Sequence, residues 1–230
     1  MEQVLIVVEK FFEDASSFLW GIPMIVLLFG THLYLTVRTG FVQRKIGTAI
    51  KLSFTSDKES AGDISQFGSL VIALAATIGT GNIIGIATAI ALGGPGAVFW
   101  CWLTGVFGIA TKYSESLLAV KYRVKTESGT MIGGAMVVLD KVLKMRWLAV
   151  LFCVFTAIAA FGIGNMTQAN SISVLVEQHF AIPPYVTGII LAVSVGIVMF
   201  GGVKWVATVC KALVPTMALV YIIGCLLLLG

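Results

Sequence analysis

Residues 72–85 read IALAATIGTGNIIG and lie inside a longer apolar run from Gln66 to Leu92. Three glycines, two threonines and an asparagine fall near the middle of this run. Glycine lowers the free-energy cost of leaving helical geometry. If the helix unwinds around Gly79–Asn82, it frees backbone N–H and C=O groups, which a membrane interior tolerates only where protein or a ligand meets them. The stretch therefore predicts a membrane helix that is broken into two halves.

The chain as a whole has the composition of an integral membrane protein. Of its 230 residues, 58% are hydrophobic and only 11% are charged, and the mean hydropathy is +1.01. No water-soluble fold of this size can hide so much apolar surface, and the same composition excludes intrinsic disorder. Four cysteines without a C-x-x-C pair and two distant histidines argue against a disulfide scaffold and a zinc site. Because the apolar runs are too long for barrel strands, we expect an all-α polytopic membrane protein.

Six apolar stretches are long enough to cross a bilayer, because about 20 helical residues span the hydrocarbon core. We expect these spans at Ser17–Val37, Gln66–Leu92, Ala97–Val120, Trp147–Val176, Tyr185–Val203 and Val206–Leu229. The preceding segment 3–13 lies among acidic residues and lacks the basic region of a secretory signal. It predicts a short amphipathic helix at the membrane surface.

Lysine and arginine are distributed asymmetrically over the connections between these spans. The connections after the first and third spans hold Arg38, Arg44, Lys45, Lys51, Lys58, Lys121, Arg123, Lys125, Lys141, Lys144 and Arg146, and Lys204 and Lys211 flank the junction of the fifth and sixth spans. The opposite side has Lys10 as its only basic residue. Since cytoplasmic connections carry the excess of positive charge, we expect six spans with the N-terminus and Gly230 both outside.

A break at Gly79–Asn82 would create two kinds of binding group. The second half-helix would begin near Asn82, where free N–H groups and the helix dipole suit a carboxylate. The carbonyl of Ile78, the Thr80 hydroxyl and the Asn82 amide oxygen are hard oxygen ligands for a small cation. Carboxylate and cation together suggest an amino acid carried with an ion. The alternative is packing, because Gly81 and Gly85 form a small-x-x-x-small pair.

Two further polar features lie in the predicted spans. Residues 161–171 read FGIGNMTQANS and place Asn165 and Gln168 three residues apart on one helical face. These amides could link helices or line a polar cavity, and the sequence does not choose between the two. Lys112 and Glu115 are also three apart, and we expect a structural ion pair, with proton or gating coupling as the alternative. His32 has no acidic or cysteine neighbour, so we expect a hydrogen-bonded packing role for it.

Three long runs resemble the alanine/glycine:cation symporter family, which includes the sodium:alanine symporters and amino acid carrier proteins. They are TGNIIGIATAIALGGPGAVFW at 80–100, ATKYSESLLAVKYR at 110–123 and FGIGNMTQANS at 161–171. The likeness extends along the chain to GGVK at 201–204 and LVP at 213–215. It implies a leucine-transporter-like fold of two inverted five-helix repeats preceded by one extra helix. Residues 1–65 would then hold the amphipathic N-terminus, the extra helix and an inner loop, and 66–230 the first repeat.

The resemblance also implies a function and a site. The family couples uptake of alanine or glycine to sodium, or in some members proton, flow by alternating access across the plasma membrane of bacteria and archaea. It implies that Gly79, Thr80, Gly81 and Asn82 contribute to the substrate and sodium sites and that Gln168 faces the substrate, with Asn165 beside it. No cofactor other than the coupling ion is expected. Neither a nucleic-acid partner nor an enzymatic activity is expected, since H-E-x-x-H and paired membrane carboxylates are absent from the sequence.

The sequence departs from the family in two respects. The usual Gly-Gly-Pro-Met of an inner loop reads GGAM at 133–136, which puts the turn of that loop in question. Family members are also about twice as long as this chain. We therefore expect an incomplete half that does not transport alone and lacks its second repeat. The alternative is a non-transporting membrane subunit or a passive pore.

Overall fold

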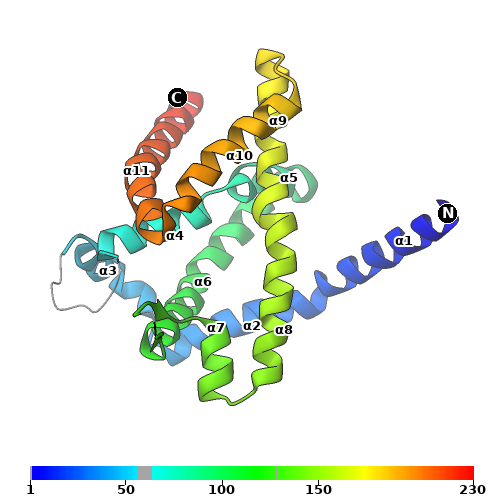
Figure 1. The fold of residues 1–230 in the computed structure, drawn as a ribbon. Coiled ribbons are helices and arrows are strands. Elements are labelled where there is room, and N and C mark those ends of the chain that lie inside the picture. Colours follow the sequence, from blue (N-terminus) through cyan, green and yellow to red (C-terminus); the bar gives the residue numbers. More distant parts are fainter. Residues whose placement is uncertain (1, 56–63, 128) are drawn as a thin grey trace.

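The computed structural model describes residues 2–55, 64–127 and 129–230, and Lys58 lies outside them. The fold is all-α apart from one small hairpin, which confirms the predicted class (Figure 1). The helices are α1 (Glu2–Leu19), α2 (Ile22–Arg38), α3 (Ile46–Phe54), α4 (Gln66–Thr77), α5 (Ile86–Gly93), α6 (Gly96–Lys121), α7 (Ala135–Val137), α8 (Arg146–Ala159), α9 (Thr167–Phe180), α10 (Pro184–Phe200) and α11 (Gly202–Leu229). A 3-10 turn, η1 (Val42–Lys45), and three π-helical turns, η2 (Gly81–Gly85), η3 (Val138–Val142) and η4 (Ala160–Met166), connect or extend them. The hairpin pairs strands β1 (Val124–Lys125) and β2 (Met131–Ile132).

Apolar helices in the described part of the chain are suited to a bilayer. Three of them, Ile6–Arg38, Arg146–Phe180 and Gly202–Leu228, are long and apolar enough to cross a membrane. A bent pair, Gln66–Thr77 with Gly81–Gly93, makes a fourth span if the two halves count as one. Most large apolar side chains are exposed, as expected where lipid replaces water around the protein. The predicted number of six spans stays a prediction.

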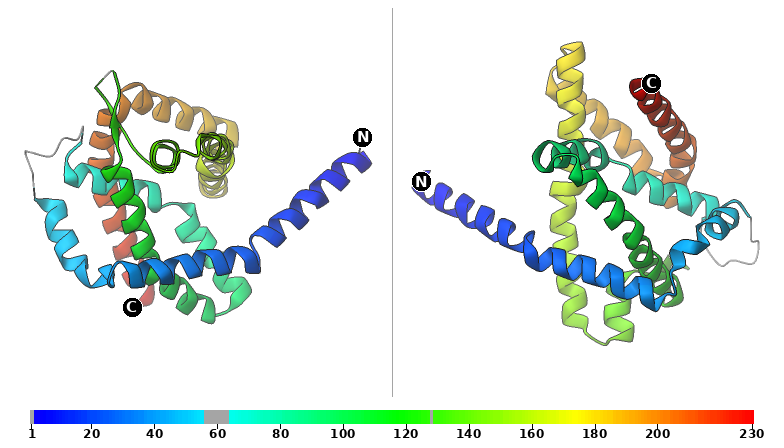
Figure 2. Two further views of the ribbon diagram at one scale, coloured as in Figure 1. Left: turned by 90° about the horizontal axis from the view of Figure 1, so that it is seen from below. Right: turned by 180° about the vertical axis from the view of Figure 1, so that it is seen from behind.

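The N-terminal segment differs from the expected short surface helix at 3–13. Helix α1 extends from Glu2 to Leu19, and only two residues separate it from α2. The two helices form one continuous apolar rod, because Pro23 lies in the first turn of α2, where its missing N–H costs no hydrogen bond. Figure 2 shows α1 projecting away from the other helices.

Two helix pairs fix the remainder of the fold. Helix α11 packs along α4, where Val71, Ala207 and Val214 are buried. Helix α2 packs along α6, where His32 Nδ1 and Thr111 Oγ1 lie 2.7 Å apart, so His32 has the predicted hydrogen-bonded packing role. These pairs hold α4 and α6 in place, and the broken helix starts from α4.

The loop with the altered Gly-Gly-Ala-Met sequence still makes its turn. Gly134 has a φ of 114°, which an L side chain rarely adopts, and Ala135 begins α7 where the family has proline. Proline is favoured at the first position of a helix but is not required there. The chain makes this turn with alanine at position 135.

Gly133 in the same loop offers a test of the packing. A Cβ added there would collide with the backbone oxygen of Ala119, which cannot move without shifting α6. We expect Gly133→Ala to lower the free energy of unfolding by about 1–3 kcal/mol, the usual cost of overpacking. Thermal unfolding in detergent measures this, with Gly30→Ala as the control because its Cβ would meet no atom within 4 Å. Equal melting temperatures for the two variants would contradict the placement of this loop.

Candidate functional site

The candidate site is the interruption between α4 and the helical segment that follows it. Helix α4 ends at Thr77, and Ile78 adopts an extended conformation with ψ of 101°. The second segment, Gly81–Gly93, continues at an angle of 53° to the first. The N–H of Ile78 still donates to Leu74 O at 2.8 Å, and that of Asn82 donates to Gly79 O at 3.0 Å. The predicted break in the Gln66–Leu92 helix is thus present, and its second half begins where it was expected.

The side chain of Asn82 closes the break from one side. Its Nδ2 donates to the carbonyl of Thr77 at 2.8 Å, a carbonyl at the C-terminal end of α4. This bond uses the nitrogen of the amide and therefore does not consume the amide oxygen that was predicted as a cation ligand. The Asn82 side chain holds the two half-helices in a fixed relation across the break.

Gln168 joins the break from the opposite helix. Its Oε1 accepts a hydrogen bond from the N–H of Thr80 at 3.3 Å, across 88 positions of sequence. A Cβ added at Gly79 would lie 3.4 Å from Gln168 Nε2, so the Gln168 amide lies directly over this glycine. Gly79, Thr80 and Gln168 are all half-buried, whereas Gly81 and Asn82 are exposed. The structure thus brings together the two polar patches that the sequence predicted separately.

A cavity of about 510 Å³ opens beside Gln168, between α9 and α10. Asn165 and Gln168 contribute its polar groups, and the remaining wall is apolar. The wall on α10 includes Gly188, Ala192 and Gly196, which the sequence analysis missed. Their spacing of four residues, which places small residues on one helical face, is the signal that could have identified them. Gln168 therefore both links two helices and lines a cavity.

The packing alternative for the glycine cluster finds no support in the described part of the chain. A Cβ added at Gly81 or at Gly85 would meet no atom within 4 Å. A small-x-x-x-small pair that allowed close helix approach would instead show tight contacts at both positions. Gly81 and Gly85 therefore form no close helix interface within the described residues.

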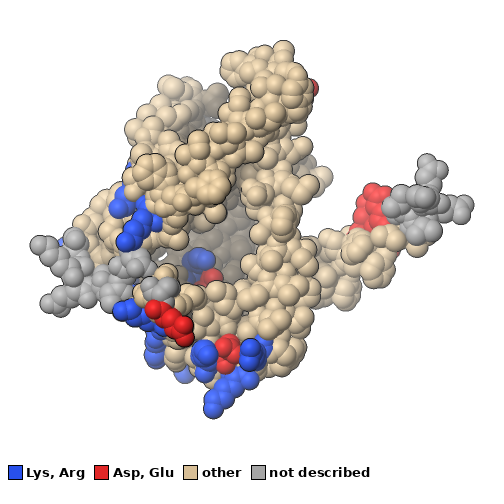
Figure 3. Space-filling view, viewed as in Figure 1, with Lys and Arg blue, Asp and Glu red and all other residues tan. Residues whose placement is uncertain are grey.

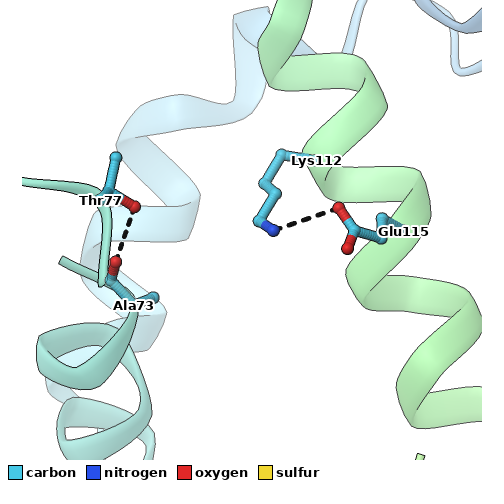
Figure 4. A network of polar contacts seen from close by, with 4 residues as sticks. All are labelled: Ala73, Thr77, Lys112 and Glu115. Carbon is cyan, nitrogen blue, oxygen red and sulfur yellow. Dashed lines mark hydrogen bonds and ion pairs between the residues drawn. The ribbon is translucent and has the colours of Figure 1, made fainter. Parts of the chain in front are cut away.

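Lys112 and Glu115 form the predicted ion pair on α6, with Nζ and Oε2 separated by 3.1 Å. Figure 4 shows Lys112 pointing from α6 toward the end of α4, where Thr77 Oγ1 donates to Ala73 O at 2.7 Å. The two side chains are 71% and 60% exposed, so the pair contributes little to stability. Its predicted structural role, and the alternative of proton or gating coupling, stay predictions.

The break contains neutral oxygens and backbone N–H groups. Within residues 2–55, 64–127 and 129–230, no group of three or more His, Cys, Asp or Glu residues could hold a metal ion. The candidate cation ligands at the break, on Ile78, Thr80 and Asn82, are neutral oxygens, which suit a hard cation of low charge. The N–H groups at the start of the second half-helix suit a carboxylate.

Comparisons with known proteins show which family the chain belongs to. The sequence profile of the sodium:alanine symporter family matches residues 5–230. An uncharacterized transporter of Haemophilus influenzae is 49% identical over 217 residues, covering 94% of this chain and 48% of the relative. The sodium/alanine symporter AgcS of Methanococcus maripaludis is 49% identical over 222 residues, covering 94% of this chain and 49% of the relative. The probable sodium/glutamine symporter GlnT of Bacillus subtilis is 38% identical over 224 residues, covering 96% of this chain and 46% of the relative.

The chain spans about half the length of the curated relatives that it matches. The match nevertheless includes both polar patches, the break at Gly79–Asn82 and the segment around Gln168. The chain belongs to the sodium:alanine symporter family.

Proposed function

We propose that the whole protein containing this chain is a secondary active transporter that couples sodium entry to uptake of a small neutral amino acid, alanine or glycine. The observation that carries the proposal is the interrupted helix whose Thr80 N–H is bonded to Gln168. A broken membrane helix offers both N–H donors for a carboxylate and carbonyl oxygens for a cation, which is how many secondary transporters build their binding sites.

In this proposal the residues of the break have separate roles. Backbone N–H groups within Gly79–Asn82, of which those of Thr80 and Asn82 are bonded to Gln168 and Gly79 in the absence of substrate, bind the substrate carboxylate, and Gln168, with Asn165 next to it, meets the amino group. The carbonyl of Ile78 and the side-chain oxygens of Thr80 and Asn82 bind sodium. Carboxylate and cation neutralise each other's charge in the low dielectric of the membrane, which makes binding of one depend on binding of the other.

The proposal includes a leucine-transporter-like arrangement. Residues 66–230 form its first five-helix repeat, and residues 1–65 provide an amphipathic N-terminus, an extra helix and a loop. The chain crosses the plasma membrane six times, with the N-terminus and Gly230 outside. A second inverted repeat completes the site and allows alternating access. Residues 1–230 reconstituted alone are expected to give no uptake.

Uptake into proteoliposomes tests the proposed function. The whole protein is reconstituted, and accumulation of labelled alanine and glycine is followed with and without an inward sodium gradient. Glutamine is included because one relative is named a probable sodium/glutamine symporter. We expect saturable uptake of alanine or glycine that depends on the sodium gradient. Uptake independent of the gradient, or a leak that does not saturate, would overturn the proposal.

Asn82→Ala separates the ion from the substrate. We expect it to raise the sodium concentration for half-maximal uptake by about tenfold, because a hydrogen-bonding or ligating group that meets a charge is worth about 1.5–3 kcal/mol. Asn82→Asp keeps a side-chain oxygen but loses the Nδ2 donor to Thr77 O, so it should retain more of the sodium affinity than Asn82→Ala does. If both variants have the sodium dependence of the parent protein, Asn82 is not a ligand.

A further inference from the structure

A second pocket lies at the other end of α8, away from the break. Its volume is about 340 Å³, and it is formed by the β hairpin, α7, η3 and the start of α8. We propose that this pocket binds one anionic phospholipid, with the phosphate at its charged mouth and an acyl chain along its apolar wall. The lining residues are Val124, Met136, Val137, Asp140, Lys141, Arg146, Ala149, Val150, Cys153 and Val154.

The mouth of the pocket carries an excess of positive charge. Lys141 Nζ lies 3.5 Å from Asp140 Oδ2, so this cation is partly neutralised. Arg146 finds no ion-pair partner within the described part of the chain and contributes the surplus charge. Figure 3 shows lysine and arginine gathered at this end of the molecule, around the junction of α7 and α8. A guanidinium group without a carboxylate partner is well suited to a phosphate, which it can bind through two hydrogen bonds.

The wall of the pocket has the character of an acyl-chain site. Val137 and Ala149, which are only 8% and 6% exposed, form the inner end of the pocket. Val150 and Val154 are exposed and form an apolar side wall. Cys153 lies two turns beyond Arg146 on α8, which places it about 10 Å further along the helix. The pocket thus has charge at its mouth and apolar side chains about 10 Å deeper. This arrangement matches a phospholipid better than a soluble anion.

The depth of the pocket in the membrane agrees with this orientation. Trp147 follows Arg146 and is 62% exposed at the first turn of α8, a helix that continues into a candidate span. Exposed tryptophans at the ends of spans mark the headgroup level. Arg146 and Lys141 therefore lie among headgroups, and Cys153 lies among acyl chains. Basic pockets between membrane helices are where anionic headgroups bind.

Cys153 provides the reporter for an experiment on the full chain. Cys101, Cys210 and Cys225 are replaced by alanine, and the rate of maleimide modification of Cys153 is measured in detergent with added lipid. We expect the mole fraction of phosphatidylglycerol that slows the reaction to be about fivefold lower than the mole fraction of phosphatidylcholine with the same effect. Each basic residue near the charged surface favours anionic lipid by about that factor. Inorganic phosphate should not slow it.

Two charge variants identify the mouth as the source of this preference. Lys141→Gln with Arg146→Gln should remove the difference between the two lipids. Lys51→Gln with Lys204→Gln removes the same charge outside the pocket and should leave the difference unchanged. Arg146→Lys keeps the positive charge and should retain most of the difference between the two lipids. The melting temperature of each variant without lipid is measured first, and native mass spectrometry counts the bound phosphatidylglycerol.

The parent protein alone can overturn the proposal. Equal protection of Cys153 by both lipids would mean that the pocket has no preference for anionic lipid. Protection by inorganic phosphate would assign it to a soluble anion, and a modification rate that added lipid does not change would mean that no lipid binds over Cys153. A preference for phosphatidylglycerol that survives removal of Lys141 and Arg146 would contradict the proposed mouth.

Discussion

Replacing Gln168 by alanine in the whole protein is expected to raise the amino acid concentration for half-maximal uptake by about tenfold or more. Gln168 Oε1 accepts the N–H of Thr80 at 3.3 Å at the centre of the break. Without this amide the charged amino group of the substrate loses its proposed acceptor, a hydrogen bond worth about 1.5–3 kcal/mol, and 1.4 kcal/mol is a factor of ten in affinity. Uptake of labelled alanine over a range of concentrations at saturating sodium measures the change.

Asn170→Ala is the matched control for this variant. Asn170 lies two residues further along α9, is exposed, and is absent from the lining of the cavity. It should keep the half-saturating concentration of the parent. If Gln168→Ala and Asn170→Ala behave alike, Gln168 has no direct part in substrate binding.

Gly79→Val should abolish most uptake. The Cβ of any side chain at Gly79 already lies 3.4 Å from Gln168 Nε2, and the two methyl groups of valine extend beyond that point. We expect the valine methyl groups to displace the Gln168 amide from Thr80, at an overpacking cost of about 1–3 kcal/mol. We expect the initial rate of uptake to fall by about tenfold or more at equal amounts of protein in the membrane.

Gly85→Val controls for the loss of a glycine in the same span. A Cβ at Gly85 would meet no atom within 4 Å, so valine there is expected to preserve uptake. The opposite order of activities, with Gly85→Val inactive and Gly79→Val active, would favour the packing interpretation of the glycine cluster. The comparison thus decides between a binding role and a packing role.

The position of the break could be predicted from residues 72–85, because the glycines clustered there lower the cost of leaving helical geometry near mid-membrane. The choice between unwinding and packing could not be made from those residues. Gly81 and Gly85 fit both, and only the empty space around them in three dimensions separates the two. Sequence spacing also does not encode the 53° angle between the half-helices.

The partnership of Thr80 and Gln168 had no local signal. The two residues are 88 positions apart, and the sequence showed only that each lies in a polar patch. The π-helical turn η4, just before Gln168, changes the register of the residues on either side of it. A regular helical spacing therefore identified the shared face of Asn165 and Gln168 but not the direction in which that face points.

The most direct test of the account is an experimental structure of the whole protein with sodium and alanine bound. We predict that the helix is interrupted between Thr77 and Gly81 and that the alanine carboxylate lies within hydrogen-bonding distance of backbone N–H groups in Gly79–Asn82. Sodium should lie among oxygens of Ile78, Thr80 and Asn82. A continuous helix from Ile72 to Leu92, or alanine bound away from the break, would contradict the account.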